Sequence, residues 1–529
     1  MKSRRERGED CDCEWWSAGQ CRPFFVPAMT DLPLQPTLEE FRNSAGKGNL
    51  VPVWVELTAD YETPLSAFEK IGEGAPRFLF ESAEVTGFSG RYSFMGAHPR
   101  RVMTARGREM KVEERGGEVR RYEVEGDPLA EVERMMSVYR PVPHPRLPAF
   151  TGGAVGCLTY DMVRYFEPKV PAAPKDELGL PEMVFMVADE VVIFDHRYRL
   201  MQVVVNVYLP EHESVEAGYE WARGRIAAMI GRLSEPRHFV PMAAAVASVP
   251  LDPVSNTTKE EYLGMVAKAK EYIKAGDIFQ VVPSQRFEVP YTGRPMEVYR
   301  ALRHVNPSPY MFCLELEDFA LAGSSPEVHV RCVDGRVDIR PIAGTRPRGG
   351  TVEEDAALAA ELLADEKERA EHIMLVDLAR NDVGRVSEFG TVKVTDLMII
   401  ERYSHVMHIV SNVTGTLAAG RTACDVMRAT FPAGTVSGSP KVRAMQVINE
   451  MEKSKRCAYA GAVGYLGFDG NLDSCIALRT VVLTKGKAFV QAGAGIVADS
   501  VPESEYLETV NKAAAALRAV ERAGRLAGA

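Results

Sequence analysis

The sequence has little of what marks membrane, secreted or nucleic-acid-binding proteins. It contains no apolar run of about 18 residues, which excludes a transmembrane helix. Its net charge is −10, from 63 basic and 73 acidic residues, and this argues against a nucleic-acid partner because binding a polyanion needs a basic face. The nine cysteines are scattered without a C-x-x-C pair. A disulfide framework is therefore not expected, and reduced thiols in a cytoplasmic protein fit best.

The first 28 residues differ in composition from the rest of the chain. Acidic residues follow the basic start at once and no apolar segment comes after them, so the pattern does not predict a targeting peptide. Cys11, Cys13 and Cys21 lack a fourth ligand at a usual zinc spacing. We expect residues 1–28 to be a disordered extension, with Met29 as a possible start of translation.

The 529 residues exceed what one hydrophobic core usually supports, so more than one domain is expected. The Pro- and Ala-rich segment 234–253 predicts a boundary between an N-terminal domain, 29–250, and a C-terminal domain, 251–529. Alternating apolar residues at 51–57, 77–84, 91–97, 183–194 and 200–208 predict antiparallel strands, with the last two forming a hairpin. From residue 257 onward helices and strands alternate. The fold class indicated is α+β.

The stretch 365–382 combines charged and apolar residues and contains candidate functional carboxylates. Glu368 and Glu371 are three residues apart and therefore share one face of a helix. A cap at Thr351 and a glycine at 384 predict one helix over about 352–381, with its buried stripe at Ile373, Met374 and Leu378. Taken alone, such a charged run is usually a solvated face.

A second acidic helix face lies near the C-terminus. Glu505, Glu508 and Lys512 follow at i, i+3 and i+7, directly after the glycine-rich segment 492–497. Two such faces suggest a site in which four glutamates bind a hard divalent cation through oxygen ligands.

Nine sequence blocks then carry a resemblance. They are KAGDIFQVVPSQR (274–286), NPSPYMF (306–312), GSSPE (323–327), PIAGTRPRG (341–349), DEKERAEHIMLVDLARND (365–382), YSHVMHIVS (403–411), FPAGTVSGSPKVRAM (431–445), YAGAVGYLGFDGNLDSCIALRT (459–480) and AGAGIVADSVPESEYLETVNKA (492–513). In this order they resemble the anthranilate synthase component I family of chorismate-utilising enzymes.

The resemblance implies a fold of two packed antiparallel β-sheets flanked by helices, with the active site between the layers. It implies catalytic roles for Glu327, His408, Thr435, Gln280 and Lys512. It implies substrate-binding roles for Tyr459, Arg479, Gly493, Ala494, Gly495, Gly344 and Thr345. It also implies Mg²⁺ as cofactor, bound directly by Glu371 and Glu508 and more distantly by Glu368 and Glu505.

The same resemblance implies regulation and a partner. Glu81, Ser82 and Arg91, together with Pro309, Tyr310 and Met311, are similar to a feedback site for tryptophan. The polar residues among them are otherwise ordinary for the edge of a strand. The sequence shows no glutaminase region, so the resemblance implies a separate glutamine amidotransferase subunit, with a heterotetramer as the expected assembly.

Two positions separate this chain from relatives in the same family. Gln280 stands where water-using isochorismate and salicylate synthases of the family have a lysine base, so an ammonia-using enzyme is favoured. Ala343 stands where aminodeoxychorismate synthases usually have a lysine that can act as nucleophile. The expected activity is conversion of chorismate and ammonia to anthranilate and pyruvate. Aminodeoxychorismate synthase component I is the alternative enzyme, and a catalytically inert tryptophan sensor the alternative of another class.

Overall fold

A computed structural model describes residues 33–74, 76–83, 90–242, 251–403 and 406–527. The extension predicted for residues 1–28 lies outside the described residues, as do Cys11, Cys13 and Cys21. Residues from Leu34 onward form one compact unit. In the described part of the chain all six cysteines are free and buried.

The first large sheet has eleven strands among the described residues, and all of its strand pairs are antiparallel. Its spatial order is β1 (Leu50–Thr58), β10 (Leu200–Tyr208), β9 (Glu190–Asp195), β3 (Tyr92–Ala97), β2 (Arg77–Glu81), β14 (Tyr310–Glu315), β15 (Ala320–Ser325), β24 (Thr480–Thr484), β25 (Lys487–Gly493), β13 (Ser284–Pro290) and β11 (Val254–Ser255).

The second large sheet has twelve strands within the described ranges and is also antiparallel. Its spatial order is β18 (Ile342–Pro347), β20 (Val406–Thr416), β17 (Arg336–Ile339), β16 (Val328–Val333), β23 (Leu472–Ile476), β22 (Ala462–Gly467), β7 (Gly153–Leu158), β8 (Met183–Ala188), β4 (Arg101–Arg106), β5 (Glu109–Glu114) and β6 (Val119–Glu123), with β19 (Lys393–Arg402) also pairing with β20. A short ribbon joins β12 (Gln280–Val281) to β21 (Gly438–Ser439).

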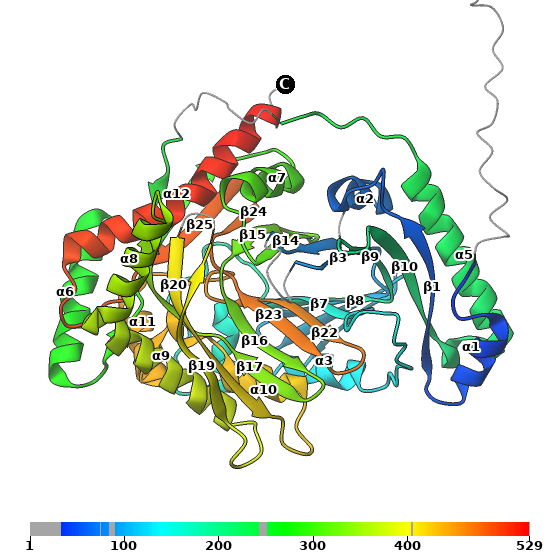
Figure 1. Cartoon of the computed structure of the whole chain (residues 1–529), viewed down its shortest axis with the longest axis horizontal. Helices are drawn as coiled ribbons and strands as arrows, with labels where there is room; N and C mark the ends of the chain where they lie inside the picture. Colours follow the sequence, from blue (N-terminus) through cyan, green and yellow to red (C-terminus); the bar gives the residue numbers. More distant parts are fainter. Residues whose placement is uncertain (1–32, 75, 84–89, 243–250, 404–405, 528–529) are drawn as a thin grey trace, which may run out of the picture. The chain divides into compact units, whose positions relative to one another are not determined.

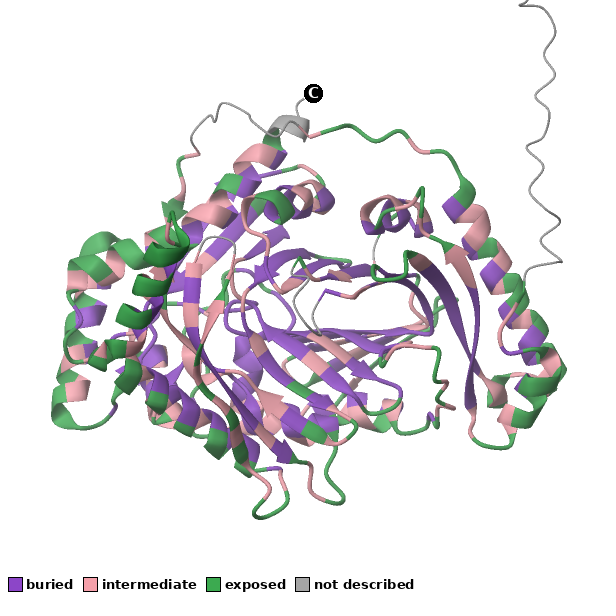
Figure 2. Ribbon diagram, viewed as in Figure 1, coloured by how far each residue is buried: buried purple, intermediate pink, exposed green. Residues whose placement is uncertain are grey.

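One hydrophobic core lies between the two large sheets. Phe78, Phe312 and Leu314 enter it from the first sheet, and Val155 and Met186 enter it from the second. Burial follows the strands, as Figure 2 shows, because each strand in the middle of the sandwich has covered neighbours on both faces. The predicted pair of packed antiparallel sheets is confirmed.

Helices cover the outer faces of both sheets (Figure 1). The first sheet contacts α1 (Leu38–Ala45), α2 (Pro64–Ile71), α5 (Val215–Ser234), α7 (Pro295–Val305) and α12 (Pro502–Ala527). The second contacts α3 (Leu129–Met136), α8 (Val352–Ala364), α9 (Glu366–Gly384) and α10 (Ala423–Thr430), while α6 (Lys259–Ala275) packs on α12 and α11 (Lys441–Met451) on the short ribbon. The short α4 (Val163–Phe166) follows β7. The flanking helices complete the predicted fold.

Both sheets combine strands from before and after the boundary predicted near residue 250. In the first sheet β2 pairs with β14, and in the second β7 pairs with β22. The segment between α5 and β11 includes residues 243–250, which lie outside the described residues. The division into 29–250 and 251–529 therefore stays a prediction about the chain, and the core is shared by both parts.

The single helix predicted over 352–381 is wrong. The segment forms two helices, α8 and α9, which meet at Asp365. The carboxylate of Asp365 accepts hydrogen bonds from the N–H groups of Lys367 and Glu368, at 3.0 and 3.1 Å, and so caps the second helix. The predicted cap at Thr351 is present at the start of α8, where its hydroxyl accepts from the N–H of Glu354.

The buried stripe predicted for this helix is also misplaced. Ile373 is 54% exposed, whereas His372, Leu375, Val376 and Ala379 are buried. Turning the helix this way buries a histidine and leaves Glu368 and Glu371 at the margin of the packed face. Both carboxylates keep their shared face, but they are partly shielded from solvent.

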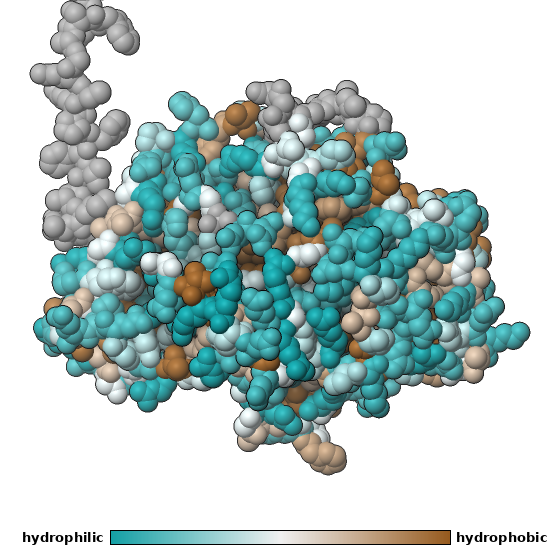
Figure 3. All heavy atoms as spheres, turned by 180° about the vertical axis from the view of Figure 1, so that it is seen from behind, coloured by the Kyte–Doolittle hydropathy of each residue, from teal (hydrophilic) through white to brown (hydrophobic). Residues whose placement is uncertain are grey.

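The apolar run 183–194 forms two strands in different sheets. Its first half, β8, belongs to the second sheet, and its second half, β9, belongs to the first and makes the predicted hairpin with β10. No helix in the described part of the chain combines the length and the apolar character that crossing a membrane would need. The face shown in Figure 3 is mostly hydrophilic, with hydrophobic side chains scattered over it.

Candidate active site

Two acidic helices bring their carboxylates into electrostatic contact. Burial raises the pKa of Glu371 on α9, the side chain of Gln280 lowers it by a hydrogen bond, and the charges of Glu368 and Glu508 raise it further. Burial also raises the pKa of Glu505 on α12, and Glu508 contributes to that shift. The two faces predicted from the sequence therefore meet across the helices.

Neighbouring cations already pair with part of this acidic group. Lys512 lies 2.6 Å from Glu508, one helical turn away, and Arg346 lies 3.3 Å from Glu368. Within the described ranges, no three His, Cys, Asp or Glu side chains stand close enough together to hold a metal. The donors are nevertheless carboxylate oxygens that repel one another, the type that Mg²⁺ prefers. The donor type suits magnesium, although the four glutamates do not stand as a ready cluster, and their assignment as ligands stays a prediction.

Glu327 lies at the turn between β15 and β16 and is only 9% exposed. Burial raises the pKa of its carboxyl to about 7, and the Thr435 hydroxyl and the cations of Lys512 and Arg479 limit the rise. With this pKa, about half of the carboxyl groups still hold their proton at pH 7. It has the property that a general acid needs.

The guanidinium of Arg479 lies near the Glu327 carboxyl and has few hydrogen-bond partners. Its guanidinium makes one long hydrogen bond, 3.4 Å from Nη1 to Asn306 Oδ1, and no ion pair with a described residue. Burial lowers the pKa of Arg479, which means that the charge lacks the solvent it would have outside. The backbone of Arg479 has a left-handed φ of +47°, a strained conformation that is common at functional sites. A planar fork of this kind is suited to a substrate carboxylate.

Two glycines near β25 let other groups approach closely. A Cβ at Gly493 would lie 2.6 Å from the hydroxyl of Tyr459, and one at Gly495 would lie 2.9 Å from Nε2 of Gln280. Any larger residue at either position would displace these side chains. The tyrosine is buried, and burial raises its pKa to about 12, so its hydroxyl stays a hydrogen-bond donor.

His408 on β20 is held by the β18 strand beside it. Its Nδ1 lies 3.0 Å from the carbonyl oxygen of Gly344 and 3.0 Å from the hydroxyl of Thr345. Because a carbonyl only accepts, this geometry assigns the proton to Nδ1 and leaves Nε2 as a free base. Burial lowers the pKa of His408, so the ring is neutral at pH 7. The structure brings together these three predicted residues.

Buried atoms without partners mark where a ligand would complete the site. Among the described residues, Gln280 Oε1 and Thr435 Oγ1 are buried with no hydrogen bond of normal geometry. The Thr435 hydroxyl is nevertheless near enough to Glu327 to lower the pKa of its carboxyl. Orphaned polar atoms are costly, and both belong to the residues predicted to contact substrate. A small cavity of about 30 Å³ beside Glu327 and Thr435 lies in the same region.

The comparison with known proteins decides the family. A family model described as chorismate binding enzyme matches residues 76–518. The chain belongs to this family. It is 48% identical over 495 residues to anthranilate synthase component 1 from Acetivibrio thermocellus, covering 93% of this chain and 99% of that protein.

Solved structures agree with this family. The crystal structure of anthranilate synthase component I from Streptococcus pneumoniae TIGR4 is 37% identical, with a TM-score of 0.73, and the match covers 87% of this chain and 99% of that one. The menaquinone-specific isochorismate synthase from Escherichia coli is 19% identical with a TM-score of 0.67, over 92% of this chain and 98% of that one, which shows the shared fold alone. This chain is therefore a chorismate-binding enzyme similar to anthranilate synthase component 1.

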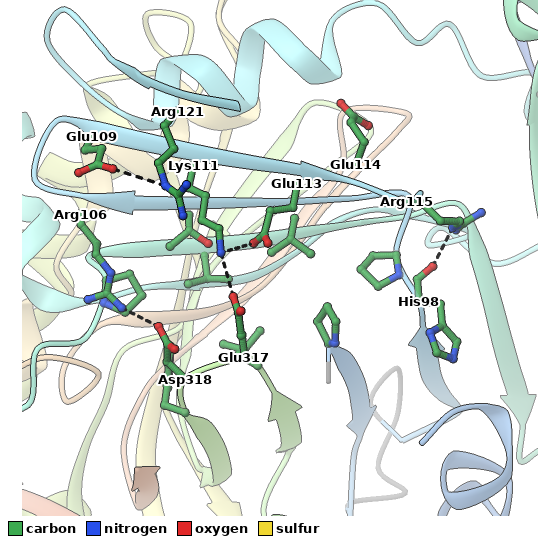
Figure 4. A pocket seen from close by; sticks show the side chains of 18 residues that line it. His98, Arg106, Glu109, Lys111, Glu113, Glu114, Arg115, Arg121, Glu317 and Asp318 are labelled. Carbon is green, nitrogen blue, oxygen red and sulfur yellow. Dashed lines mark hydrogen bonds and ion pairs between the residues drawn. The ribbon is translucent and has the colours of Figure 1, made fainter. Parts of the chain in front are cut away.

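A wide groove of this chorismate-binding enzyme lies elsewhere. It has a volume of about 710 Å³ and runs along β4 and β5 to the turn between β14 and β15 (Figure 4). Its charges pair with one another: Lys111 contacts Glu113 and Glu317, each at 2.9 Å, and Arg106 contacts Asp318 at 2.8 Å. No predicted catalytic or substrate-binding residue lines it. The predicted active-site residues gather around Glu327 instead, where Arg479 makes one long hydrogen bond and the Thr435 hydroxyl and Gln280 Oε1 have no hydrogen-bond partner among the described residues.

The residues predicted to bind tryptophan come together in part. The pairing of β2 with β14 sets Met311 directly opposite Glu81, although they are far apart in sequence. Ser82 follows β2, and the N–H of Ala83 donates to Ser308 O at 3.1 Å, which brings this segment beside Pro309. The segment 84–89 lies outside the described residues.

Three of the predicted regulatory side chains already have protein partners. Glu81 accepts hydrogen bonds from Tyr299, at 2.5 Å, and from Arg303, at 3.1 Å. Arg91 forms an ion pair with Asp195 at 2.7 Å. The hydroxyl of Tyr310 donates to Asp473 Oδ1 at 3.0 Å, on the facing sheet. A ligand here would therefore exchange existing contacts for new ones.

Sequence reasoning missed residues that support the site from behind. Asn306, in the block NPSPYMF, is the hydrogen-bond partner of Arg479. Arg456, three residues before Tyr459, is buried beneath the site. Arg456 ends a highly charged segment, 450–456, which in the sequence is indistinguishable from a solvated surface stretch, so no sequence signal indicated its role.

Proposed function

We propose that this chain is the large component of an anthranilate synthase, which converts chorismate and ammonia to anthranilate, pyruvate and water. The observation that carries the proposal is the buried carboxyl of Glu327, which has a pKa of about 7 and faces the cations of Arg479 and Lys512. A proton donor beside two cations matches a dianionic substrate that must lose a hydroxyl group. The similarity to component 1 proteins supports the same conclusion.

The residues divide the chemistry as follows. Arg479 and Tyr459 bind the enolpyruvyl carboxylate, helped by the close backbone at Gly493 and Gly495. Glu327 gives its proton to the C4 hydroxyl as that group leaves, while ammonia forms a bond to C2 and loses a proton. His408 accepts the C2 proton at its unprotonated Nε2 while the bond between C3 and the ether oxygen breaks, and the enolpyruvate that leaves becomes pyruvate. The polar atoms of Gln280 and Thr435 that now lack partners would orient the ring.

A magnesium ion held by Glu371 and Glu508, with Glu368 and Glu505 behind them, would supply charge neutralisation at the ring carboxylate. The remaining assignments follow from similarity. A separate amidotransferase subunit would provide ammonia from glutamine, within a heterotetramer in the cytoplasm. These assignments are proposals that the next experiment begins to test.

The purified chain should form fluorescent anthranilate from chorismate, Mg²⁺ and ammonium at raised pH, where free ammonia is abundant. With glutamine in place of ammonium it should be inactive until an amidotransferase component is added. A product of aminodeoxychorismate type would contradict the proposed reaction. Turnover of glutamine by the chain alone would contradict the proposed partner.

Tryptophan should inhibit the enzyme by binding where β2 and β14 lie side by side, next to Ser82. Ser82→Phe should abolish that inhibition with chorismate turnover retained, because a large ring beside the strand end occupies the space of the ligand while the catalytic residues lie elsewhere. Initial rates with and without tryptophan measure the effect, and the rate without tryptophan is the internal control. If Ser82→Phe remains as sensitive as the parent, the regulatory site lies elsewhere. If titrations of tryptophan and chorismate do not weaken each other by the same factor, the allosteric coupling is absent.

A further inference from the structure

A buried ion pair lies directly behind the predicted substrate residues. Arg456 is 2% exposed and Glu452, the residue that ends α11, is 8% exposed. The two form a bidentate pair, with Nε to Oε2 at 2.9 Å and Nη2 to Oε1 at 2.6 Å. Neither side chain reaches the surface.

The guanidinium also holds the backbone of two site segments. Its Nη1 donates to the carbonyl oxygen of Val436 at 2.8 Å, and its Nη2 donates to that of Val282 at 2.5 Å. Val436 follows Thr435 in a short 3-10 turn, η4 (Gly434–Val436). Val282 is two residues from Gln280. One side chain therefore fastens the two segments whose buried polar atoms lack partners.

The same pair contacts the remaining walls of the site. The Glu452 carboxylate accepts from both the N–H and the hydroxyl of Ser284, each at 2.8 Å, and Ser284 is the strand partner of Gly493. The Arg456 guanidinium lies over the ring of Tyr459, 5.4 Å from its centroid. Four predicted substrate-contacting segments thus meet at one ion pair.

We propose that Arg456, fixed by Glu452, is the positioning residue of this active site, which sets the mutual placement of Gln280, Thr435, Tyr459 and Gly493. It is too buried to touch substrate, so its effect passes through the residues it holds. A bidentate fork that also reaches two carbonyls is a geometry that only a planar guanidinium provides. The inference rests on the proposed function, since it concerns the placement of groups for that reaction.

Arg456→Lys tests the proposal, because lysine keeps the charge beside Glu452 but loses the fork and the carbonyl contacts. We expect kcat/KM for chorismate to fall by about 10²-fold, the size of effect that a 1 Å misplacement can have. The protein should remain folded by circular dichroism. Unchanged kcat/KM in the folded variant would overturn the proposal.

The chain offers a matched control. Arg77 forms the same bidentate pair with Glu315, at 2.8 and 2.9 Å, donates to the carbonyls of Gly72 and Phe68, and lies over the Phe68 ring. Arg77→Lys removes the same contacts from a pair that touches no predicted catalytic or substrate-binding segment. It should lower the melting temperature to a similar degree and keep kcat/KM within about twofold. An equal loss of activity in both variants would reduce the role of Arg456 to stability alone.

The pH profile separates positioning from stability. The Thr435 hydroxyl helps to limit the pKa of Glu327, which Lys512 and Arg479 also face. Arg456→Lys should loosen η4 and move the Thr435 hydroxyl away from Glu327. The fall of kcat/KM at high pH, the limb of the profile that reports the loss of the Glu327 proton, should then occur at a higher pH. Arg77→Lys should leave that limb in place, because loss of folded protein scales the whole profile. An unmoved limb in Arg456→Lys would count against positioning through Thr435.

If Arg456→Lys does not fold, Ser284→Ala decides. It removes the hydrogen bond that the Ser284 hydroxyl donates to Glu452 and the one that it accepts from Gln491, and it leaves the ion pair, so kcat/KM should fall several-fold with little change in melting temperature. Normal kcat/KM in this variant would overturn the proposal. Failure of the proposed function and failure of the role of Arg456 give different results. If the wild-type protein makes no anthranilate, the proposed function is wrong. If the wild-type protein is active and the variants are equally active, only the role of Arg456 is wrong.

Discussion

Replacing Glu327 by glutamine should abolish most turnover while making the folded protein more stable above neutral pH. The amide keeps the shape of the side chain but cannot donate a proton to the departing hydroxyl. General acid catalysis contributes about 10²–10⁴-fold, so kcat should fall by that factor. Chorismate affinity should change little, because Arg479 and Tyr459 remain.

The stability half of this prediction follows from proton linkage. The Glu327 pKa is raised from 4.5 to about 7 in the folded protein. Between these pH values the native state holds a proton that the unfolded state has released, so the parent loses stability as pH rises through this window. The full loss, on the order of 3 kcal/mol, applies above pH 7.

Glu327→Gln removes that penalty. Its melting temperature should exceed that of the parent at pH 8, and the difference should vanish towards pH 4.5. Calorimetry across this range, with anthranilate fluorescence for activity, measures both halves. A variant that is inactive and also less stable at pH 8 would mean that Glu327 is a structural carboxylate. In the parent, the activity that depends on this acid should decline above pH 7.

Replacing Glu371 by glutamine should remove most magnesium-dependent activity. The proposed site joins two helices through carboxylates, and burial and neighbouring negative charges raise the pKa of Glu371 and Glu505, so the loss of one charge should weaken cation binding strongly. Glu508→Gln should behave in the same way. Without Mg²⁺, Glu371→Gln should be as stable as the parent or more stable, because one repelling charge is gone.

Magnesium binding gives a measurement that does not depend on turnover. A cation that binds only the folded state raises the melting temperature, and this rise should be present in the parent and absent from Glu371→Gln and Glu508→Gln. Glu503→Gln is the control, since Glu503 lies on the same helix and forms an exposed pair with Lys259 at 2.8 Å. An equal rise in all four proteins would place the metal elsewhere.

The sequence by itself determined which residues share a helix face and which segments form strands. The spacing of Glu368 and Glu371, and of Glu505, Glu508 and Lys512, depends only on helical periodicity, and both faces occur as predicted. The alternating apolar residues likewise predicted antiparallel strands. Local rules of this kind act within a few residues and can be applied without the fold.

Only the tertiary structure determined where each strand or helix ends and which other elements it packs against. The run 183–194 is apolar except at Asp189 and Glu190, and it crosses from one sheet to the other because each half pairs with strands of a different layer. The stripe of α9 turned away from Ile373 because β20, and not the periodicity of the helix, determines which face is covered.

The supporting contacts of the site were also beyond the sequence. Arg456 lies 174 residues from Val282 in the chain and 20 from Val436, and nothing local connects them. The raised pKa of Glu327 has the same origin, because burial is a property of everything packed around a group. Residue types and spacing specify what a side chain can do, whereas long-range packing determines where it acts and in which protonation state.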